Sequence, residues 1–360
     1  MYKTSFLFPN KLRIIAGWLL IAFFIPIVLC TGCSGDDDDP PDPTGTTKNR
    51  VLQYKGHERE YLIYTPSIHP HGIIIAMHGI GQKMTDFTER FDFRPTVNHL
   101  NYLLISPQAL PEKDQSVINS INVLRAQSPD ISNVIPLSAL WDCGLRATIS
   151  LSSLGTVLDV VLNKNIDDAG FLDTLIKQTL TEYSMENRNI FVSGTSMGGY
   201  MSYQYALTHG SDIRLSGIIP IVGTHGTDIA GEGNEVKVPV CDFSSETDEE
   251  VPYYNGWYEV SVNNIGTAKV QVAKPKPDVI DFWVAKNGAV AAPIVYTYPT
   301  SGTKHTTVTK YTYAATNGKN EVIHYQSDNT DHNYFFKKSN EDAMDYLEEI
   351  TKFIQAHEEQ

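Results

Sequence analysis

Short, continuous apolar runs constrain the fold of this chain more than any other feature of its sequence. Four of them lie at residues 72–79 (GIIIAMHG), 101–107 (NYLLISP), 215–223 (LSGIIPIVG) and 236–244 (VKVPVCDFS). They do not alternate between apolar and polar residues, so they are typical of strands buried on both faces of a parallel sheet. Helical patterns lie between and after these runs, and we therefore predict an α/β fold with a mainly parallel central sheet.

The helices and the remaining strands are predicted from periodicity and capping residues. Helices are expected at residues 167–184, 278–288 and 339–358. Further strands are expected in the two halves of residues 50–66, around a turn at Lys55-Gly56, and at residues 293–300, 304–314 and 320–327. Residues 110–150 show no regular pattern and are predicted to form a loop.

The first 33 residues resemble a bacterial lipoprotein signal and are predicted to lie outside the folded domain. A positively charged start precedes an apolar run at residues 14–29, and the sequence LCTGC ends at Cys33. Cys33 is predicted to be the lipidated residue that becomes the new N-terminus. Residues 34–49 are rich in Asp and Pro and are predicted to form a solvated tether, so a single domain is expected over residues 50–360.

The charge of the chain bears on its partners and location. The net charge of −14 argues against nucleic acid as a partner, because phosphate binding requires a basic surface. The acidic run Asp36–Asp39 follows Cys33 closely and resembles the export signal of some outer-membrane lipoproteins. We therefore expect an outer-membrane lipoprotein that faces the cell surface and contacts the membrane only through its N-terminal lipid.

A serine turn between a strand and a helix carries the strongest chemical signal. In the sequence NIFVSGTSMGGYMSYQYAL, residues 189–207, a β-type run leads to Ser196, which lies between Gly194 and Gly198, and a helical run follows. A strand-turn-helix of the Gly-x-Ser-x-Gly type lifts the serine hydroxyl out of the backbone, where a base can reach it. The positive end of the following helix favours a developing oxyanion. We therefore predict that Ser196 is a nucleophile.

A serine nucleophile requires oxyanion donors, an acid and a base in a set order along the chain. The loop AMHGIGQ at residues 76–82 can aim the N–H of Ile80 at the same oxygen as the N–H of Met197, whereas His78 is predicted to be structural. Composition does not choose among the candidate acids Asp242, Glu246, Asp248, Glu249 and Glu250. The late candidate bases are His305, His324, His332 and His357. Of these, His332 lies in a polar loop that leaves it free to point at a sheet edge.

These motifs resemble the polyhydroxybutyrate depolymerase and feruloyl esterase group of α/β-hydrolases. The matching elements are His78-Gly79, Asp167-Asp168 with Gly170-Phe171, the Ser196 turn, Asp248 with Val251-Pro252-Tyr253, and Trp283 with Asn287-Gly288. The resemblance covers roughly residues 55–355 and implies an α/β-hydrolase fold with Asp248 as the acid and His332 as the base. This chain departs from the family at Asp331, where the family has a glycine before the histidine.

The resemblance implies a serine carboxylesterase that needs no metal and no organic cofactor. Ser196 is expected to attack an ester carbonyl while His332 takes its proton and Asp248 orients the imidazole. Together with surface display, the resemblance favours feruloyl or acetyl esters of plant polysaccharide as substrates. Polyhydroxybutyrate or short-chain ester hydrolysis, peptide hydrolysis and non-catalytic glycan binding are the alternatives.

Three further sets of side chains are considered for special roles. Trp141 in the segment ALWDCG either stacks on a substrate ring or is buried. Cys143 and Cys241 either form a disulfide or are two independent buried thiols. His69 and His71 are two residues apart and have no evident third ligand, so no metal site is predicted.

Overall fold

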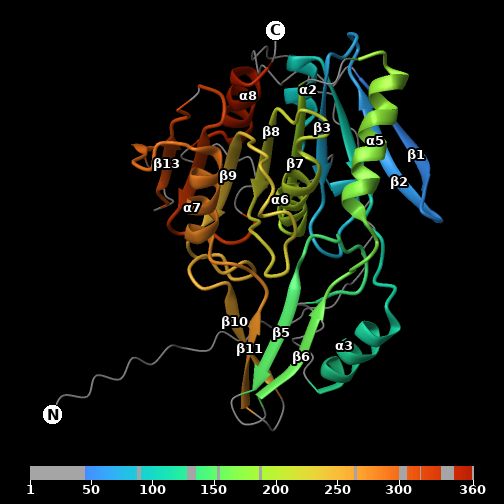
Figure 1. Cartoon of the computed structure of the whole chain (residues 1–360), viewed down its shortest axis with the longest axis vertical. Helices are drawn as coiled ribbons and strands as arrows, with labels where there is room; N and C mark the ends of the chain where they lie inside the picture. Colours follow the sequence, from blue (N-terminus) through green and yellow to red (C-terminus); the bar gives the residue numbers. More distant parts are fainter. Residues whose placement is uncertain are drawn as a thin grey trace, which may run out of the picture. The chain divides into compact units, whose positions relative to one another are not determined.

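The computed structural model describes residues 45–86, 91–127, 135–151, 155–185, 189–262, 266–299, 306–316, 318–333 and 344–358. Within these residues, ten strands form one sheet (Figure 1). In sheet order they are β1 (Thr46–Tyr54), β2 (His57–Thr65), β4 (Tyr102–Pro107), β3 (Gly72–Met77), β7 (Ile190–Thr195), β8 (Gly217–Ile221), β9 (Val240–Ser245), β14 (Val322–Ser327), β13 (Val308–Tyr313) and β12 (Ile294–Thr297).

The centre of this sheet is parallel and its margins are antiparallel. Neighbouring strands from β4 through β14 pair in parallel, whereas β1, β2, β13 and β12 pair antiparallel to their neighbours. All residues of β3, β4, β7, β8 and β9 are buried, which explains why these segments are apolar without alternation. The predicted α/β class with a mainly parallel central sheet is confirmed.

Helices cover both faces of the sheet. On one face, apolar side chains come from α5 (Asp168–Glu182), α6 (Met197–His209) and α7 (Lys276–Asn287). On the other face they come from α2 (Arg94–Leu100) and α8 (Tyr346–Ala356). The predicted glycine stop of α7 is present, because Gly288 has a φ of 67° and forms the left-handed C-cap.

A second, antiparallel sheet was not predicted. It has the order β10 (Trp257–Val262), β11 (Gly266–Gln271), β5 (Arg146–Leu151) and β6 (Gly155–Val161), and Figure 1 shows it below the ten-stranded sheet, near α3 (Gln115–Gln127). The prediction of an irregular loop over residues 110–150 is therefore wrong, since α3 lies within this range and β5 begins in it. Both elements depend on partners distant in sequence, such as the pairing of Leu151 in β5 with Ala268 in β11.

The ends of the chain bear on the predicted domain boundaries. The strand β1 begins at Thr46, so regular structure starts before Arg50, the predicted start of the domain. The signal segment, Cys33 and the tether up to residue 44 lie outside the described residues. None of the described helices is both long enough and apolar enough to cross a bilayer. Cys143 and Cys241 are two free, buried thiols and form no disulfide.

Candidate active site

Ser196 occupies a strained turn between β7 and α6. Its backbone has φ 53° and ψ −120°, a conformation that residues other than glycine rarely adopt. The turn is held because the Ser196 N–H donates to the Ile221 carbonyl over 2.8 Å. A side chain at Gly198 would collide with the Met77 carbonyl oxygen, so only glycine allows this close approach of helix and strand. This geometry is that of a nucleophile elbow.

Ser196 opens onto a cavity of about 330 Å³. Part of the cavity wall comes from the loop after β3 and from α6, which contribute Ile80, Met197 and Tyr200. Other lining residues belong to the second sheet or directly flank its strands: Leu145, Leu162, Tyr258, Val260 and Val272. Two carboxylates, Glu249 and Glu250, also line the cavity, which is otherwise mostly apolar.

The topology brings the predicted acid and base to the same edge of the sheet as Ser196. Asp248 follows β9 and His332 follows β14, and both strands run parallel to β7. The loops at the carboxyl ends of parallel strands meet at one edge, which is where open α/β sheets bind ligands. His332 Nδ1 lies 2.7 Å from Asp248 Oδ2, and both side chains are buried.

Hydrogen bonds and charges around this pair define its protonation. Asp248 Oδ1 accepts from the N–H groups of Glu250 and Val251, each over 2.8 Å. The carboxylate Oε2 of Glu250 lies 3.8 Å from His332 Nε2. Burial lowers the pKa of His332, but the hydrogen bond and charge of Asp248, with the charges of Glu250 and Asp331, raise it above its ordinary value. The imidazolium form of His332 is therefore stabilised.

His78 is held as a neutral side chain next to the oxyanion loop. Its Nε2 accepts from the N–H of Ala109 over 3.1 Å and lies 3.0 Å from Gln108 Nε2, so the proton resides on Nδ1. Burial lowers the pKa of His78 to about 4. Gln108 was missed by the sequence analysis, although a polar residue directly after the buried run at residues 101–107 was an available signal.

The same loop orients the N–H of Ile80. The carbonyl oxygen of Gly79 lies 2.7 Å from His78 Nδ1 and accepts from the Gln82 N–H over 3.2 Å. The Gly79–Ile80 peptide is trans, so the Ile80 N–H points to the side opposite that oxygen. Ile80 lines the cavity with Ser196 and with Met197, whose N–H is at the first turn of α6. Both predicted oxyanion residues therefore line the same cavity as the serine.

A second buried Asp–His pair lies away from the cavity. His324 Nδ1 is 2.8 Å from Asp242 Oδ1, but His324 Nε2 is 3.0 Å from the Tyr253 hydroxyl. Asp242 also forms a 2.7 Å ion pair with Lys276. Burial disfavours the charge of Asp242, yet Lys276 and His324 hold its pKa well below the usual range. Neither member of this pair lines the cavity, so the pair is part of the core. Another candidate base, His305, lies outside the described residues.

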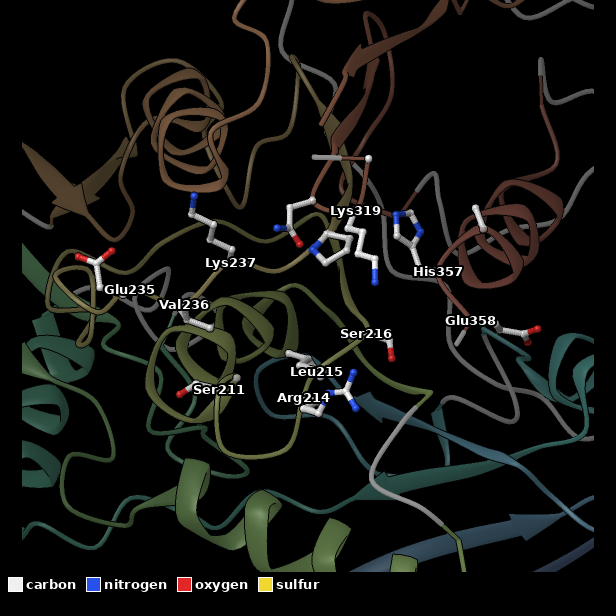
Figure 2. Close-up of a pocket in the computed structure, with 15 residues that line it drawn as sticks. Ser211, Arg214, Leu215, Ser216, Glu235, Val236, Lys237, Lys319, His357 and Glu358 are labelled. Atoms are coloured by element: carbon white, nitrogen blue, oxygen red, sulfur yellow. The ribbon is translucent and has the colours of Figure 1, made fainter. Parts of the chain in front are cut away.

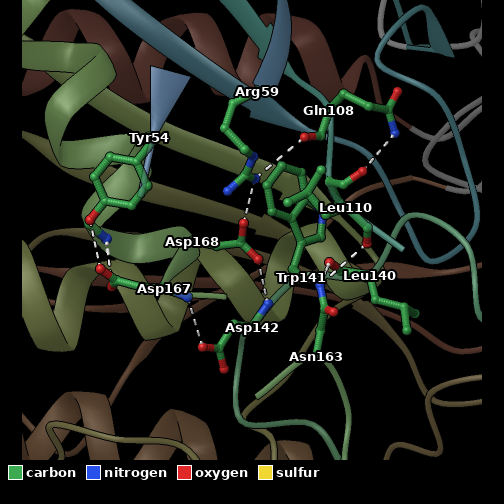
Figure 3. Close-up of polar contacts among 12 residues, drawn as sticks. Tyr54, Arg59, Gln108, Leu110, Leu140, Trp141, Asp142, Asn163, Asp167 and Asp168 are labelled. Carbon is green, nitrogen blue, oxygen red and sulfur yellow. Dashed lines mark hydrogen bonds and ion pairs between the residues drawn. The ribbon is translucent and has the colours of Figure 1, made fainter. Parts of the chain in front are cut away.

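Trp141 does not provide the predicted stacking surface. Its side chain is fully buried and is absent from the cavity wall. Its Nε1–H donates to the carbonyl of His78 over 2.9 Å. Figure 3 shows Trp141 among the buried polar contacts that surround Asp168. The substrate-binding prediction for Trp141 is wrong, because its ring is buried against His78 of the oxyanion loop. The alternative of a buried tryptophan is the correct one.

A larger cavity of about 790 Å³ lies at the opposite edge of the sheet (Figure 2). Ser216 and Pro239, which line it, directly precede β8 and β9, so this cavity lies at the amino ends of the strands. His357 is also in its wall, but Nδ1 of this histidine is 2.8 Å from the Phe353 carbonyl. Nε2 of the same histidine lies 3.6 Å from Glu321 Oε1, beyond hydrogen-bond distance, so among the described residues this cavity wall holds no Asp–His hydrogen bond of the kind that His332 forms.

No group of three or more His, Cys, Asp or Glu side chains in the described part of the chain is arranged to hold a metal ion.

Comparisons with known proteins identify the fold. No protein-family model and no curated protein matches the sequence. Among solved structures, the chain is similar to an acetyl xylan esterase from Aspergillus awamori, with 10% identity, a TM-score of 0.53 and coverage of 87% of this chain and 100% of that one. It is also similar to an S-formylglutathione hydrolase from Agrobacterium tumefaciens, with 11% identity, a TM-score of 0.50 and coverage of 88% and 97%. The chain has the α/β-hydrolase fold.

Proposed function

We propose that this protein is a serine carboxylic ester hydrolase. The observation that carries the proposal is the strained Ser196 turn, which opens onto a mostly apolar cavity at the sheet edge where Asp248 and His332 are hydrogen-bonded. A serine with this backbone, a buried Asp–His pair and the N–H groups of residues in the same cavity wall are the parts that acyl transfer needs.

In the proposed reaction, Ser196 Oγ attacks the ester carbonyl carbon and His332 accepts the serine proton. Asp248 holds Nδ1–H of His332 and stabilises the imidazolium that forms. The N–H groups of Ile80 and Met197 bind the oxyanion of the tetrahedral intermediate. The imidazolium then protonates the leaving alcohol, and water hydrolyses the acyl-enzyme by the same route. No step of this mechanism requires a metal or an organic cofactor.

The substrates we propose are feruloyl or acetyl esters on plant polysaccharide. The largely apolar cavity suits an uncharged acyl group, and the name of the similar Aspergillus awamori enzyme describes removal of acetyl groups from xylan. We further propose that Cys33 anchors the enzyme as an outer-membrane lipoprotein at the cell surface, where it meets polymers too large to enter. Absence of labelled-palmitate incorporation in wild-type cells, or its persistence in Cys33→Ala, contradicts the anchor.

The decisive experiment uses a fluorophosphonate probe and a substrate panel on wild type, Ser196→Ala and Ser202→Ala. Ser202 is a matched control, because it is buried in the same helix and donates its hydroxyl proton to the Gly198 carbonyl. We expect labelling and p-nitrophenyl acetate turnover in wild type and Ser202→Ala, and a loss of several orders of magnitude in Ser196→Ala. Labelling that persists in Ser196→Ala contradicts the esterase proposal.

The panel then separates the alternatives. Methyl ferulate and acetylated xylan represent the proposed substrates, whereas polyhydroxybutyrate and a peptide represent the rival hydrolases. Binding of xylan without probe labelling would favour a non-catalytic glycan-binding protein.

A further inference from the structure

Residues 139–142 form hydrogen bonds with the oxyanion loop on both sides of Ile80. Before Ile80, Trp141 Nε1–H donates to the His78 carbonyl over 2.9 Å. The indole also packs against the His78 ring, with a centroid separation of 5.1 Å. After Ile80, the Gly81 N–H donates to the Ala139 carbonyl over 3.1 Å. The two hydrogen bonds therefore fix the peptides that flank the predicted oxyanion donor.

This segment is itself anchored in the core. The Asp142 N–H donates to Asp168 Oδ2 over 2.6 Å, and Asp168 Oδ1 forms an ion pair with Arg59 at 2.5 Å, in which both side chains are fully buried. Asn163 Nδ2 donates to the Leu140 carbonyl over 2.6 Å. Figure 3 shows that α5 and the segment after β6 contact residues 140–142 directly, whereas Arg59 of β2 contacts Asp168. These hydrogen bonds fix the position of residues 140–142, and the segment in turn fixes the position of the oxyanion loop.

From these contacts we infer that Trp141 is a positioning residue for the oxyanion donor Ile80, and that Asp168 acts through it. This inference rests on the proposed esterase function. It also gives a role to Asp168, which with Asp167 forms one of the motifs that resemble the family but has no part in the proposed mechanism.

The expected consequence is specific to the transition state. A hydrogen bond to the substrate oxygen strengthens as negative charge develops on it, so a displaced Ile80 N–H costs little in the ground state and much in the transition state. Loss of the Trp141 bond leaves the peptide that precedes Gly79 held only through its N–H, which donates to Gln82 Oε1 over 2.9 Å, and this weaker hold changes the direction of the next N–H. The effect should therefore fall on kcat rather than KM.

The test compares Trp141→Phe with Trp283→Phe. Trp283 is the matched control, because it is also fully buried and donates Nε1–H, in this case to His225 Nε2 over 2.9 Å. For Trp141→Phe we expect kcat to fall about tenfold to a hundredfold with KM changed less than about threefold. Trp283→Phe should keep kcat within about threefold. Thermal unfolding of both variants measures the shared cost of removing a buried indole N–H.

A trifluoromethyl ketone provides a second readout, because its adduct with Ser196 carries an oxyanion. The affinity of the enzyme for the ketone should fall in Trp141→Phe by the same factor as kcat. The pH at which half of the activity is lost on the acidic side of the pH profile should stay that of wild type. Equal kcat in the two tryptophan variants, or a fall in kcat without a fall in ketone affinity, overturns the inference and leaves the esterase proposal standing. Retained turnover in Ser196→Ala overturns both.

Discussion

Replacement of Glu250 by glutamine should extend esterase activity to lower pH. The Glu250 carboxylate lies 3.8 Å from His332 Nε2, where its negative charge stabilises the imidazolium and so raises the pKa of His332. The proposed mechanism needs the neutral imidazole as base, so wild type loses activity as pH falls through this ionisation. Removal of the charge lowers the pKa of His332, and the acid limb of kcat/KM should move to lower pH.

The size of the effect follows from the separation and the exposure of the carboxylate. The Glu250 side chain is 62% exposed, so water screens its charge strongly. At this separation and a dielectric constant near that of water, the interaction amounts to about 1 kcal/mol. That energy corresponds to about a fivefold change in proton affinity. Well below the midpoint, the normalised kcat/KM of Glu250→Gln should therefore exceed that of wild type by up to about fivefold.

The assay is kcat/KM for p-nitrophenyl acetate across pH, with each profile normalised to its own plateau. Glu249→Gln is the control for general negative charge, since Glu249 lines the same cavity, and its midpoint should move less. Salt at about 1 M shortens the Debye length to about 3 Å, so it should shrink the difference between Glu250→Gln and wild type. Identical midpoints for wild type and Glu250→Gln at low salt would refute the reasoning.

Three other substitutions test the site and its turn. His332→Ala should lose nearly as much turnover as Ser196→Ala, and the double variant little more, because triad members act as a unit; additive losses contradict this. Asp248→Asn should lose at least about a hundredfold in kcat by favouring the wrong imidazole tautomer, and a near-wild-type rate would argue against its role. Gly198→Ala should lower the free energy of unfolding by at least about 3 kcal/mol in denaturant titrations, because its added carbon collides with backbone. Gly233→Ala is the control, because nothing lies within 4 Å of its added carbon, and its free energy of unfolding should stay within about 0.5 kcal/mol of wild type. Equal losses of stability in the two variants would refute the collision at Gly198.

The central strands could be predicted because their signals are local. Each position of β3 and β7 faces a covered side of the sheet, so the segments are apolar without interruption and need no knowledge of their neighbours. The second sheet gives no such signal. Its strand β5 alternates buried and half-buried positions over only six residues, and it is stabilised by pairing with β11, far along the chain. Tertiary contacts of this kind are not readable from one segment.

The turn of the candidate site was predictable, because its backbone conformation demands particular residues, such as the glycines around Ser196. The choice between Asp242 and Asp248 was different, because each hydrogen-bonds Nδ1 of a late histidine. Only their surroundings separate the two pairs: the Tyr253 hydroxyl lies 3.0 Å from Nε2 of His324, whereas Glu250, a residue of the cavity wall, is a charged neighbour of His332 Nε2. The sequence alone offered the family resemblance but no physical criterion for that choice.

In the proposed enzyme, the two-sheet architecture separates substrate choice from bond-breaking chemistry. No strand of the four-stranded sheet pairs with the ten-stranded sheet in the described part of the chain, yet β10 supplies Tyr258 and Val260 to the cavity wall. Exchange of these side chains reshapes the cavity without touching the strand hydrogen bonds that hold β7, β9 and β14 in register. Under the proposed function, substitutions in one sheet would therefore change the acyl groups that the cavity accepts, while the other sheet keeps the catalytic residues in place.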